Sequence, residues 1–245
     1  MTYDVSQMKR EKPTVTLVLA CYNEALIFAQ SVARIREAMD AGKFPYEIIF
    51  VDDASTDGTP DLIRNICRRA PSYHALFHSV NQGRGKTVAD GIMHAKGSVV
   101  GYIDIDCEVS PVYIPFIVSQ ILNKKADIVI GRRNYRTSLA SLYREGLSRG
   151  YQRISALMLD TGGLDTETGY KFFNRKKIVP ILKFVENKGW FWDTEIMVRA
   201  KHAGLRITEI PVLFIRRFDK HSSVRVIRDS AAYLVHLWEL RNKIT

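Results

Sequence analysis

The chain has 245 residues, of which 46% are hydrophobic, so it can bury a core, and a mainly disordered protein is excluded. The longest run without a charged side chain, Val109 to Asn123, is interrupted by two prolines and is shorter than the roughly 20 residues that a membrane-spanning helix needs. Three cysteines without close spacing argue against a disulfide framework and a zinc site, so we expect a cytoplasmic protein, with peripheral contact with the inner face of the membrane left open.

The net charge of +10 is distributed unevenly along the chain. Residues 1–123 contain 12 Lys and Arg against 14 Asp and Glu, a net charge of −2, whereas residues 124–245 contain 24 against 12, a net charge of +12. The first half therefore has carboxylates to hold a cation. The second half has positive charge to meet nucleic acid, an acidic membrane or a phosphorylated substrate.

Short apolar runs alternate with helical patterns through the first half of the chain. Strands are predicted at 14–20, 46–51, 75–78, 99–103 and 127–130, and helices at 24–39, 59–69, 85–95 and 112–122. This alternation predicts right-handed crossovers and an α/β fold, in which helices cover both faces of a mostly parallel central sheet. The second half is less regular, with helices predicted at 139–159, 191–202 and 229–241 and strands at 169–174 and 206–214.

Polar segments follow the first four predicted strands. They are residues 21–24, 52–59, 81–86 and 104–108, and three of them carry acidic side chains. Ligands of parallel sheets bind beyond the carboxyl ends of the strands, so we expect these four segments to share the edge that holds the site.

Two aspartates, Asp104 and Asp106, come directly after the strand at 99–103. Residues two apart on extended backbone point the same way, and two carboxylates so placed repel each other unless a cation lies between them. Hard oxygen ligands suit Mg²⁺ or Mn²⁺, and Glu108 could supply a third oxygen. The pattern predicts a divalent metal site with open positions for phosphate oxygens.

Asp52 and Asp53 follow the second strand in the same way. One of them can accept a hydrogen bond from a base or from a ribose hydroxyl, and the other can cap the turn. Asp57 and Gly58 are interpreted as turn residues alone.

The glycine-rich segment 81–86 is neither a Walker loop nor a dinucleotide-binding loop, because valines stand at positions 80 and 88, where those motifs require glycine. It predicts a turn into a helix start with two cations, which suits a phosphate or a nucleotide edge. The six histidines show no metal-ligand spacing and are interpreted as surface or core residues, although His221 lies in the basic run 216–225.

Taken together, four motifs resemble family 2 glycosyltransferases with the GT-A fold, and most nearly the polyprenyl (dolichyl) phosphate mannose and glucose synthases. The motifs are ACYNE at 20–24, VDDASTDGT at 51–59, NQGRGK at 81–86 and DID at 104–106, and their order and spacing agree over about residues 14–131. The resemblance implies one GT-A (Rossmann-like) domain over residues 1–245. Its parts are a nucleotide-sugar-binding half at 13–131, an acceptor half at 132–227 and a C-terminal amphipathic helix at 228–245.

The resemblance also implies roles for individual residues. The nucleotide of a GDP- or UDP-sugar donor would be held by residues that follow the strands, namely Tyr22, Glu24, Asp52, Asp53 and Gly83. A divalent ion on the diphosphate, Mg²⁺ or Mn²⁺, would be held by Asp104 and Asp106. Glu108 stands where the synthases often have glutamine, which adds negative charge to the metal site. The leaving diphosphate would be assisted by Lys86 and by Arg217 or Arg225, which lie in a segment resembling a mobile clamping loop.

The second half supplies the acceptor side in this resemblance. Arg133 is a candidate for binding an acceptor phosphate, and Arg144 and Ser148, in the basic segment 144–150, are candidates too. Residues 168–171 resemble a segment near the donor sugar. Asp193 stands on a late helix where base-using relatives carry an acceptor-side aspartate.

The expected activity is an inverting, metal-dependent transfer of a sugar from a nucleotide-diphosphate donor to a polyprenyl (dolichyl-type) phosphate at the membrane surface. A phosphate acceptor needs no base, because its second pKa is about 6. The alternative is transfer to a hydroxyl of a polysaccharide or glycolipid, with Asp193 as the base. A nucleic-acid-binding module, suggested by the basic half, is a distant alternative, and we expect no nucleic-acid partner.

The last predicted helix has two interpretations. Its apolar residues, flanked by basic ones, form either an interfacial helix on a membrane or a helix packed on the domain; they are Tyr233, Leu234, Leu237, Trp238 and Leu240.

Overall fold

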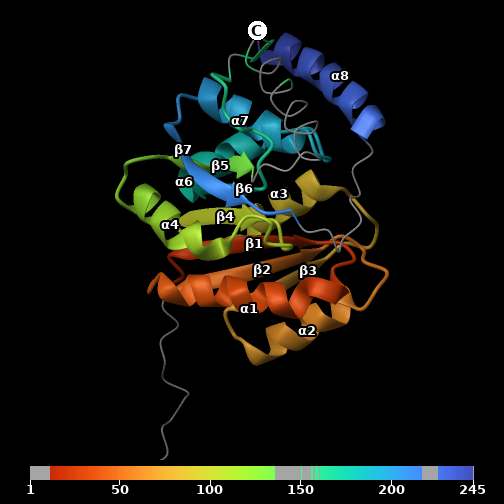
Figure 1. The fold of residues 1–245 in the computed structure, drawn as a ribbon, viewed down its shortest axis with the longest axis vertical. Coiled ribbons are helices and arrows are strands. Elements are labelled where there is room, and N and C mark those ends of the chain that lie inside the picture. Colours follow the sequence, from red (N-terminus) through yellow and green to blue (C-terminus); the bar gives the residue numbers. More distant parts are fainter. Residues whose placement is uncertain are drawn as a thin grey trace, which may run out of the picture.

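The computed structural model describes residues 12–135, 161–216 and 226–244, together with positions 150, 156, 158 and 159. Its strands, in chain order, are β1 (Val15–Cys21), β2 (Tyr46–Asp52), β3 (Tyr73–Phe77), β4 (Val99–Ile103), β5 (Ile128–Tyr135), β6 (Tyr170–Asn174) and β7 (Ile207–Phe214). They form one seven-stranded sheet in the order β3-β2-β1-β4-β6-β5-β7 (Figure 1). The central strands β1, β2 and β4 are almost wholly buried, which explains why their sequences are nearly continuous apolar runs.

The sheet is mostly parallel, with one exception. β1 pairs in parallel with β2 and β4, β2 with β3, and β5 with β7. β6 is antiparallel to both of its neighbours, β4 and β5. An antiparallel strand begins at the edge where its neighbours end, so the residues just before β6 join the carboxyl edge of the sheet. The backbone N–H of Asp104 accordingly donates to the carbonyl of Gly169 at 3.1 Å.

Helices cover both faces of the sheet. In chain order they are α1 (Ala25–Ala41), α2 (Thr59–Arg69), α3 (Arg84–His94), the short 3-10 helix η2 (Pro111–Tyr113), α4 (Ile114–Leu122), α6 (Arg175–Leu182), α7 (Trp192–His202) and α8 (Val226–Ile244). One core takes residues from α1, α2 and α4, and the other takes residues from α3, α6 and α7. Figure 1 shows α1 and α2 across the sheet from α6 and α7. The predicted α/β fold, with helices on both faces of a mostly parallel sheet, is confirmed.

The last helix, α8, packs on α7 rather than on the sheet. Leu237 and Leu240 are buried against Phe191 and Val198 in a third, small core. On the other side of α8, Leu234, Val235 and Trp238 are 43%, 54% and 61% exposed. The packed interpretation of this helix is therefore correct for one side, while the other side remains apolar and exposed. None of the described helices is long and apolar enough to cross a bilayer.

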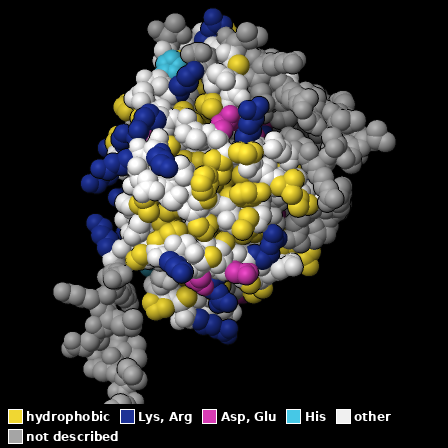
Figure 2. Space-filling view, turned by 60° about the vertical axis from the view of Figure 1, so that its left-hand side comes forward, with side chains coloured by type: hydrophobic (Ala, Val, Ile, Leu, Met, Phe, Trp, Pro, Cys, Tyr) yellow, Lys and Arg dark blue, Asp and Glu magenta, His cyan; other side chains and the backbone are white. Residues whose placement is uncertain are grey.

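Exposed apolar side chains are not confined to α8. Figure 2 shows the face on the side of α4 and β7, where hydrophobic side chains gather across the middle and Lys and Arg lie around them. Phe116 and Leu122 on α4 and Leu213 on β7 are among the exposed hydrophobic residues.

Candidate active site

The segments that follow β1 and β2 are joined by hydrogen bonds at the carboxyl edge of the sheet. The backbone N–H of Asn23 donates to Ser55 Oγ at 2.9 Å, and the N–H of Thr56 donates to Asn23 Oδ1 at 2.8 Å. Asn23 has φ = 57°, a left-handed conformation that asparagine tolerates better than most residues. The expectation that these segments share one edge is confirmed for this pair.

Tyr22, Glu24 and Asp57 lie in the same pair of segments. Tyr22 is 46% exposed, whereas Glu24 is buried and its backbone N–H donates to Thr59 Oγ1 at 2.8 Å. Asp57 accepts the N–H groups of Ala25 and Thr59, so its carboxylate binds the first turn of α1 and its own turn. These bonds lower the pKa of Asp57 against the opposing effect of burial. The interpretation of Asp57 as a turn residue is confirmed.

Asp53 is buried and surrounded by donors. Its Oδ1 accepts the backbone N–H of Gln82 at 2.8 Å and lies 2.7 Å from His78 Nδ1. Its Oδ2 accepts the backbone N–H of Gly83 at 2.9 Å. Asp53 therefore fastens the segment before α3 to the end of β2.

Asp52 has more capacity for a ligand than Asp53. Its Oδ2 accepts the N–H of Ser55 at 3.1 Å, whereas its Oδ1 is buried without a hydrogen-bond partner among the described residues. A buried oxygen without a donor is unfavourable, and an N–H group of a nucleotide base would relieve that cost. Of the two aspartates, Asp52 is thus the better candidate for contact with a base.

The glycine-rich segment brings Arg84, rather than Lys86, to the predicted metal ligand. Gly83 precedes α3 with φ = 92°, and a Cβ at this position would lie 2.7 Å from the carbonyl oxygen of Lys188. Arg84 follows, and its Nε and Nη2 donate to Asp104 Oδ1 at 3.2 and 2.7 Å. Lys86 instead contacts Asp90, one turn further along α3.

Arg84 also reaches α7, where its Nη1 donates to Asp193 Oδ2. Asp193 is only 2% exposed, and its Oδ1 accepts from the Tyr102 hydroxyl and, at 2.7 Å, from Lys171 Nζ. Lys171 is completely buried on β6 and also donates to the carbonyl of Thr168. The proposed base is therefore held between two cations and a hydroxyl.

The pKa values in this cluster follow from burial and charge. Burial raises the pKa of Tyr102, and the Asp193 carboxylate raises it further. Burial lowers the pKa of Lys171, and Asp193 opposes that effect. Burial alone would lower the pKa of Arg84, but the carboxylates of Asp104 and Asp193 outweigh this effect and raise that pKa.

Asp104 lies at the end of β4 with its side chain 49% exposed. Arg84 donates to Oδ1 of Asp104. Oδ2 of Asp104 lies against Gly169, so close that a Cβ added to Gly169 would be 1.9 Å from it. No described residue donates a hydrogen bond to Oδ2. Asp104 thus offers one carboxylate oxygen at the open edge, which is the kind of donor that Mg²⁺ and Mn²⁺ prefer.

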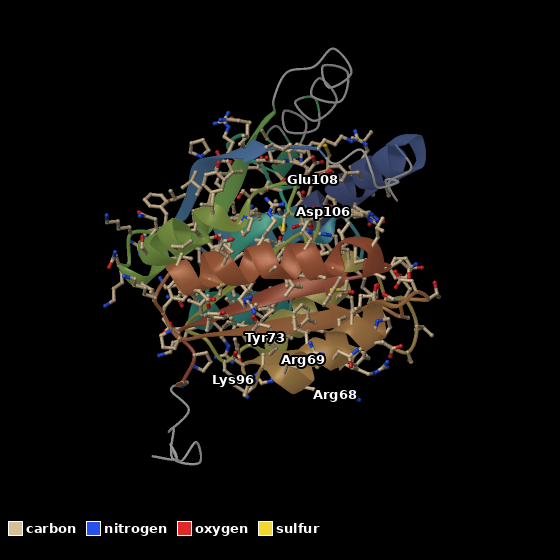
Figure 3. The ribbon with its side chains drawn as sticks, turned by 60° about the horizontal axis from the view of Figure 1, so that its bottom comes forward. Arg68, Arg69, Tyr73, Lys96, Asp106 and Glu108 are labelled. Carbon is tan, nitrogen blue, oxygen red and sulfur yellow. The ribbon has the colours of Figure 1, made fainter. Side chains whose placement is uncertain are left out.

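Asp106 and Glu108 are placed differently from the sequence expectation. The backbone beyond Asp104 is not extended, because Cys107 has φ = 54° and its N–H donates back to the Asp104 carbonyl at 3.1 Å, which closes a turn. Asp106 Oδ1 accepts the N–H of Glu108 at 3.2 Å, and Figure 3 shows the two residues together, away from Arg68 and Arg69. The expectation that the Asp106 side chain points the same way as that of Asp104, as on extended backbone, is therefore wrong.

Within the part of the chain that the structure describes, no three Asp, Glu, His or Cys side chains are grouped so that they could hold a metal ion. A three-carboxylate site of Asp104, Asp106 and Glu108 is thus not assembled here. Magnesium commonly binds through one or two carboxylates and completes its shell with substrate phosphates and water. Asp104 fits that mode.

Arg133, the candidate for the acceptor phosphate, is held by a buried carboxylate. Its Nε and Nη2 donate to the two oxygens of Asp165 at 2.9 and 2.7 Å, and its Nη2 lies 3.5 Å from Glu167. Glu209 accepts the backbone N–H of Asp165 at 2.8 Å. Burial acts to raise the pKa of Asp165, but Arg133 outweighs it and lowers that pKa. The guanidinium therefore has a fixed orientation at the carboxyl end of β5.

Arg144, Ser148, Arg217 and Arg225 lie outside the described residues. Sequence reasoning did not single out three residues that the structure places in the cluster; these are Arg84, Tyr102 and Lys171. Arg84 and Lys171 stood in segments already selected, so their positive charge was the available signal. Tyr102 gave no signal, because it lies in an apolar strand.

The family model for Glycosyl transferase family 2 matches residues 16–181. Glycosyltransferase AglD of Haloferax volcanii is 28% identical over 229 residues, which cover 91% of this chain and 37% of that protein. Dolichyl-phosphate beta-glucosyltransferase ALG5A of Trichomonas vaginalis is 30% identical over 210 residues, 81% of this chain and 64% of that protein. Dolichyl-phosphate beta-glucosyltransferase of Saccharomyces cerevisiae is 25% identical over 226 residues, which cover 82% of this chain and 67% of that protein. The chain thus spans between 37% and 67% of the length of these curated relatives.

A similar solved structure is glucosyl-3-phosphoglycerate synthase from Mycobacterium tuberculosis in complex with Mn²⁺, uridine diphosphate and glucosyl-3-phosphoglycerate. Its TM-score is 0.67 at 19% identity, over 94% of this chain and 80% of that one. The same enzyme with uridine diphosphate alone gives a TM-score of 0.70. At this identity the likeness concerns the fold, and it agrees with the α/β architecture described above. Because the family model spans the chain from β1 into α6, well over half of its length, this protein belongs to glycosyl transferase family 2, as its four motifs predict.

Proposed function

We propose that this chain transfers a sugar, with inversion, from a nucleoside-diphosphate donor to a polyprenyl phosphate at a membrane surface, and that it uses Mg²⁺ or Mn²⁺. The names of the two dolichyl-phosphate beta-glucosyltransferases support the acceptor class and favour glucose as the sugar. The similar structures that contain uridine diphosphate favour a UDP-sugar over a GDP-sugar.

The observation that carries the acceptor class is the state of Asp193. A general base needs a free lone pair within reach of the acceptor hydroxyl. Asp193 is buried, and its two oxygens already accept from Arg84, Lys171 and Tyr102. An acceptor that is already ionised has no proton to lose, so it does not need this carboxylate as a base. The arrangement therefore favours a phosphate acceptor, whose second pKa is about 6, over a hydroxyl.

On the donor side, Asp52 Oδ1 would accept an N–H of the base. Asp104 Oδ2 and Asp106 would hold the divalent ion, which neutralises the charge that develops on the leaving diphosphate. Arg84 holds the other oxygen of Asp104, so the carboxylate keeps one orientation toward the open edge. Lys86, Arg217 and Arg225 remain candidates for assisting the diphosphate.

On the acceptor side, Arg133 would orient the phosphate, and Asp165 fixes the direction of the guanidinium. An oxygen of the acceptor phosphate attacks the anomeric carbon from the face opposite the diphosphate. The bond from that carbon to the diphosphate oxygen breaks as the new bond forms, and its electron pair leaves with the diphosphate. Attack from the opposite face inverts the anomeric centre.

Contact with a membrane would bring the enzyme to a lipid acceptor. The exposed apolar side of α8, with Leu234, Val235 and Trp238, supports such contact. We propose peripheral binding on the cytoplasmic face, where a nucleotide sugar is available.

The test is an acceptor comparison. UDP-glucose and GDP-mannose are each offered with dolichyl phosphate or with dolichol, with Mn²⁺ or with EDTA, and the anomeric configuration of the product is read by NMR. Transfer to dolichyl phosphate alone, lost in EDTA and inverted in configuration, is the expected result. Transfer to dolichol would instead support the hydroxyl alternative with Asp193 as the base.

The role of Arg133 has a matched control in its neighbour. Arg133→Ala, with or without Arg144→Ala, should abolish transfer to dolichyl phosphate while UDP binding survives. Arg132 is 63% exposed and lies 3.9 Å from Glu209, so Arg132→Ala should leave transfer intact. Unchanged lipid glycosylation in the Arg133 and Arg144 variants would exclude these arginines as the phosphate site.

A further inference from the structure

A histidine stands between two carboxylates directly beside the candidate donor site. His78 follows β3, and its side chain is 9% exposed. Its Nδ1 lies 2.7 Å from Asp53 Oδ1, and its Nε2 lies 3.1 Å from Asp90 Oδ2. The interpretation of this histidine as an ordinary surface or core residue is therefore incomplete.

The protonation state of His78 follows from its neighbours. An ionised carboxylate only accepts hydrogen bonds, and a neutral imidazole can donate from one nitrogen only. Two carboxylates on opposite sides of the ring therefore require the doubly protonated imidazolium. The charged groups around it are Asp53 at the end of β2, Asp90 on α3, and Lys86, whose Nζ lies 2.5 Å from both oxygens of Asp90. Two cations and two carboxylates thus alternate in one row.

Asp53, the last residue of this row, also binds the turn that precedes Arg84. Besides His78, the Asp53 carboxylate binds the backbone N–H groups of Gln82 and Gly83. Gly83 is the last residue before α3, and the next residue, Arg84, donates two hydrogen bonds to Asp104 Oδ1. A change in the position of Asp53 therefore moves the start of α3 and the guanidinium on it.

We infer that His78, as an imidazolium, is a positioning residue of the donor site: it locks Asp53 to Asp90 and so holds the Gln82–Gly83 turn that presents Arg84 to Asp104. This inference rests on the proposed function, because it takes the site to bind a nucleoside diphosphate. A side chain at position 78 that cannot bind both carboxylates would loosen the Asp53 anchor and weaken donor binding.

The experiment measures binding of UDP and of GDP, each with Mn²⁺, by calorimetry. It uses the wild-type chain, His78→Gln and Asp90→Asn. The matched control is His74→Gln, because His74 lies near the start of β3, the strand that His78 follows, and pairs with a different carboxylate, Glu47, at 3.4 Å. Steady-state kinetics give KM for the donor and kcat for the same variants.

His78→Gln and Asp90→Asn should each weaken nucleotide binding by about tenfold, the loss expected for about one charge-assisted hydrogen bond. In steady-state kinetics the effect should be a rise in KM for the donor more than a fall in kcat. His74→Gln should behave as the wild type. Asp90→Asn provides a second reading if His78→Gln folds poorly.

The outcomes separate the two claims. Nucleotide affinity equal to that of the wild type in His78→Gln or, if that variant folds poorly, in Asp90→Asn would overturn the positioning role and leave the proposed function standing. A wild-type chain that binds neither nucleotide would overturn the proposed function, and the inference with it. An equal loss in His74→Gln would identify a general effect of strand β3 and would also refute the specific role of His78.

Discussion

Replacing Asp193 by asparagine distinguishes a charge-pairing residue from a catalytic base. The two side chains have nearly the same shape, so Asp193→Asn creates no cavity and removes only the charge. In the wild type this carboxylate is 2% exposed and bonds to Arg84 and to the fully buried Lys171. The variant leaves Lys171 with the carbonyl of Thr168 and no carboxylate.

The size of the effect follows from that burial. Removing one partner of a buried ion pair costs about 3–5 kcal/mol, because the remaining charge stays buried without compensation. For a chain of this length the loss corresponds to a fall in Tm of about 6–20 °C. An unpaired catalytic base gives the opposite expectation, because its removal leaves the fold unchanged or more stable.

The assay is chemical denaturation in guanidinium chloride, supported by a thermal melt. Asp61→Asn is the control, since Asp61 pairs with Arg64 on the surface at side-chain exposures of 81% and 49%, and such pairs contribute about 0–1 kcal/mol. Lys171→Met combined with Asp193→Asn should recover part of the loss, because both partners of the pair are then neutral. Stability of Asp193→Asn within about 1 kcal/mol of the wild type would refute the reasoning and restore the hydroxyl alternative.

Three further predictions concern other parts of the molecule. Gly169→Ala places a Cβ 1.9 Å from Asp104 Oδ2 and should lower activity by about 100-fold through displacement of that carboxylate, together with weaker Mn²⁺-dependent UDP binding in a thermal-shift titration. Hydrogen bonds from Arg206 hold the pKa of Asp127 below its usual value. This carboxylate therefore stabilises the folded state above about pH 3.9, and that stabilisation is lost as the pH falls toward the pKa of the folded state. In Asp127→Asn, the free energy of unfolding should depend less on pH in the acid range. Trp238→Ala should lower binding to phosphatidylserine-containing vesicles by about tenfold in co-sedimentation.

Each of these predictions has a control and a contradicting result. Gly58→Ala meets only an ordinary contact, 3.7 Å from Ala25 Cβ, and should stay active; equal activity of the Gly169 variant would show that Asp104 does not need its present position. A parallel acid profile in Asp127→Asn would remove this carboxylate from the acid transition. Phe116 on α4 is 57% exposed, and if Phe116→Ala reduces vesicle binding as much as Trp238→Ala does, α8 is not the membrane-facing element.

The first half of the fold was predictable because its signals are local. The run at 14–20 corresponds to β1 at Val15–Cys21, and the helix expected at 85–95 is α3 at Arg84–His94. Buried parallel strands are continuous apolar runs, and the polar segments after them mark the carboxyl edge. The direction of β6 was not predictable, because an isolated strand pattern does not say which way the strand runs beside its neighbours.

The individual site residues were predictable in type but not in pairing. Asp104 and Asp193 were selected from their segments, yet no pattern indicated that Arg84, 20 positions from the first and 109 from the second, links them. Lys86 has the same charge as Arg84 and lies two residues away, but it points along α3 to Asp90. Which cation reaches Asp104 depends on the position of the start of α3 after Gly83, where a Cβ would lie 2.7 Å from the Lys188 carbonyl oxygen.

The amino-acid sequence alone determined the α/β class, the carboxyl edge as the place of the site and the family, because each depends on the order and spacing of residues along the chain. The tertiary structure decided which acids remain available to a ligand. Asp53 and Asp193 are bonded to His78, Arg84 and Lys171, whereas Asp52 and Asp104 each keep one oxygen without a described donor. The physical reason is that a carboxylate's role depends on its burial and on the donors around it, and those donors come from distant segments that only the fold brings together.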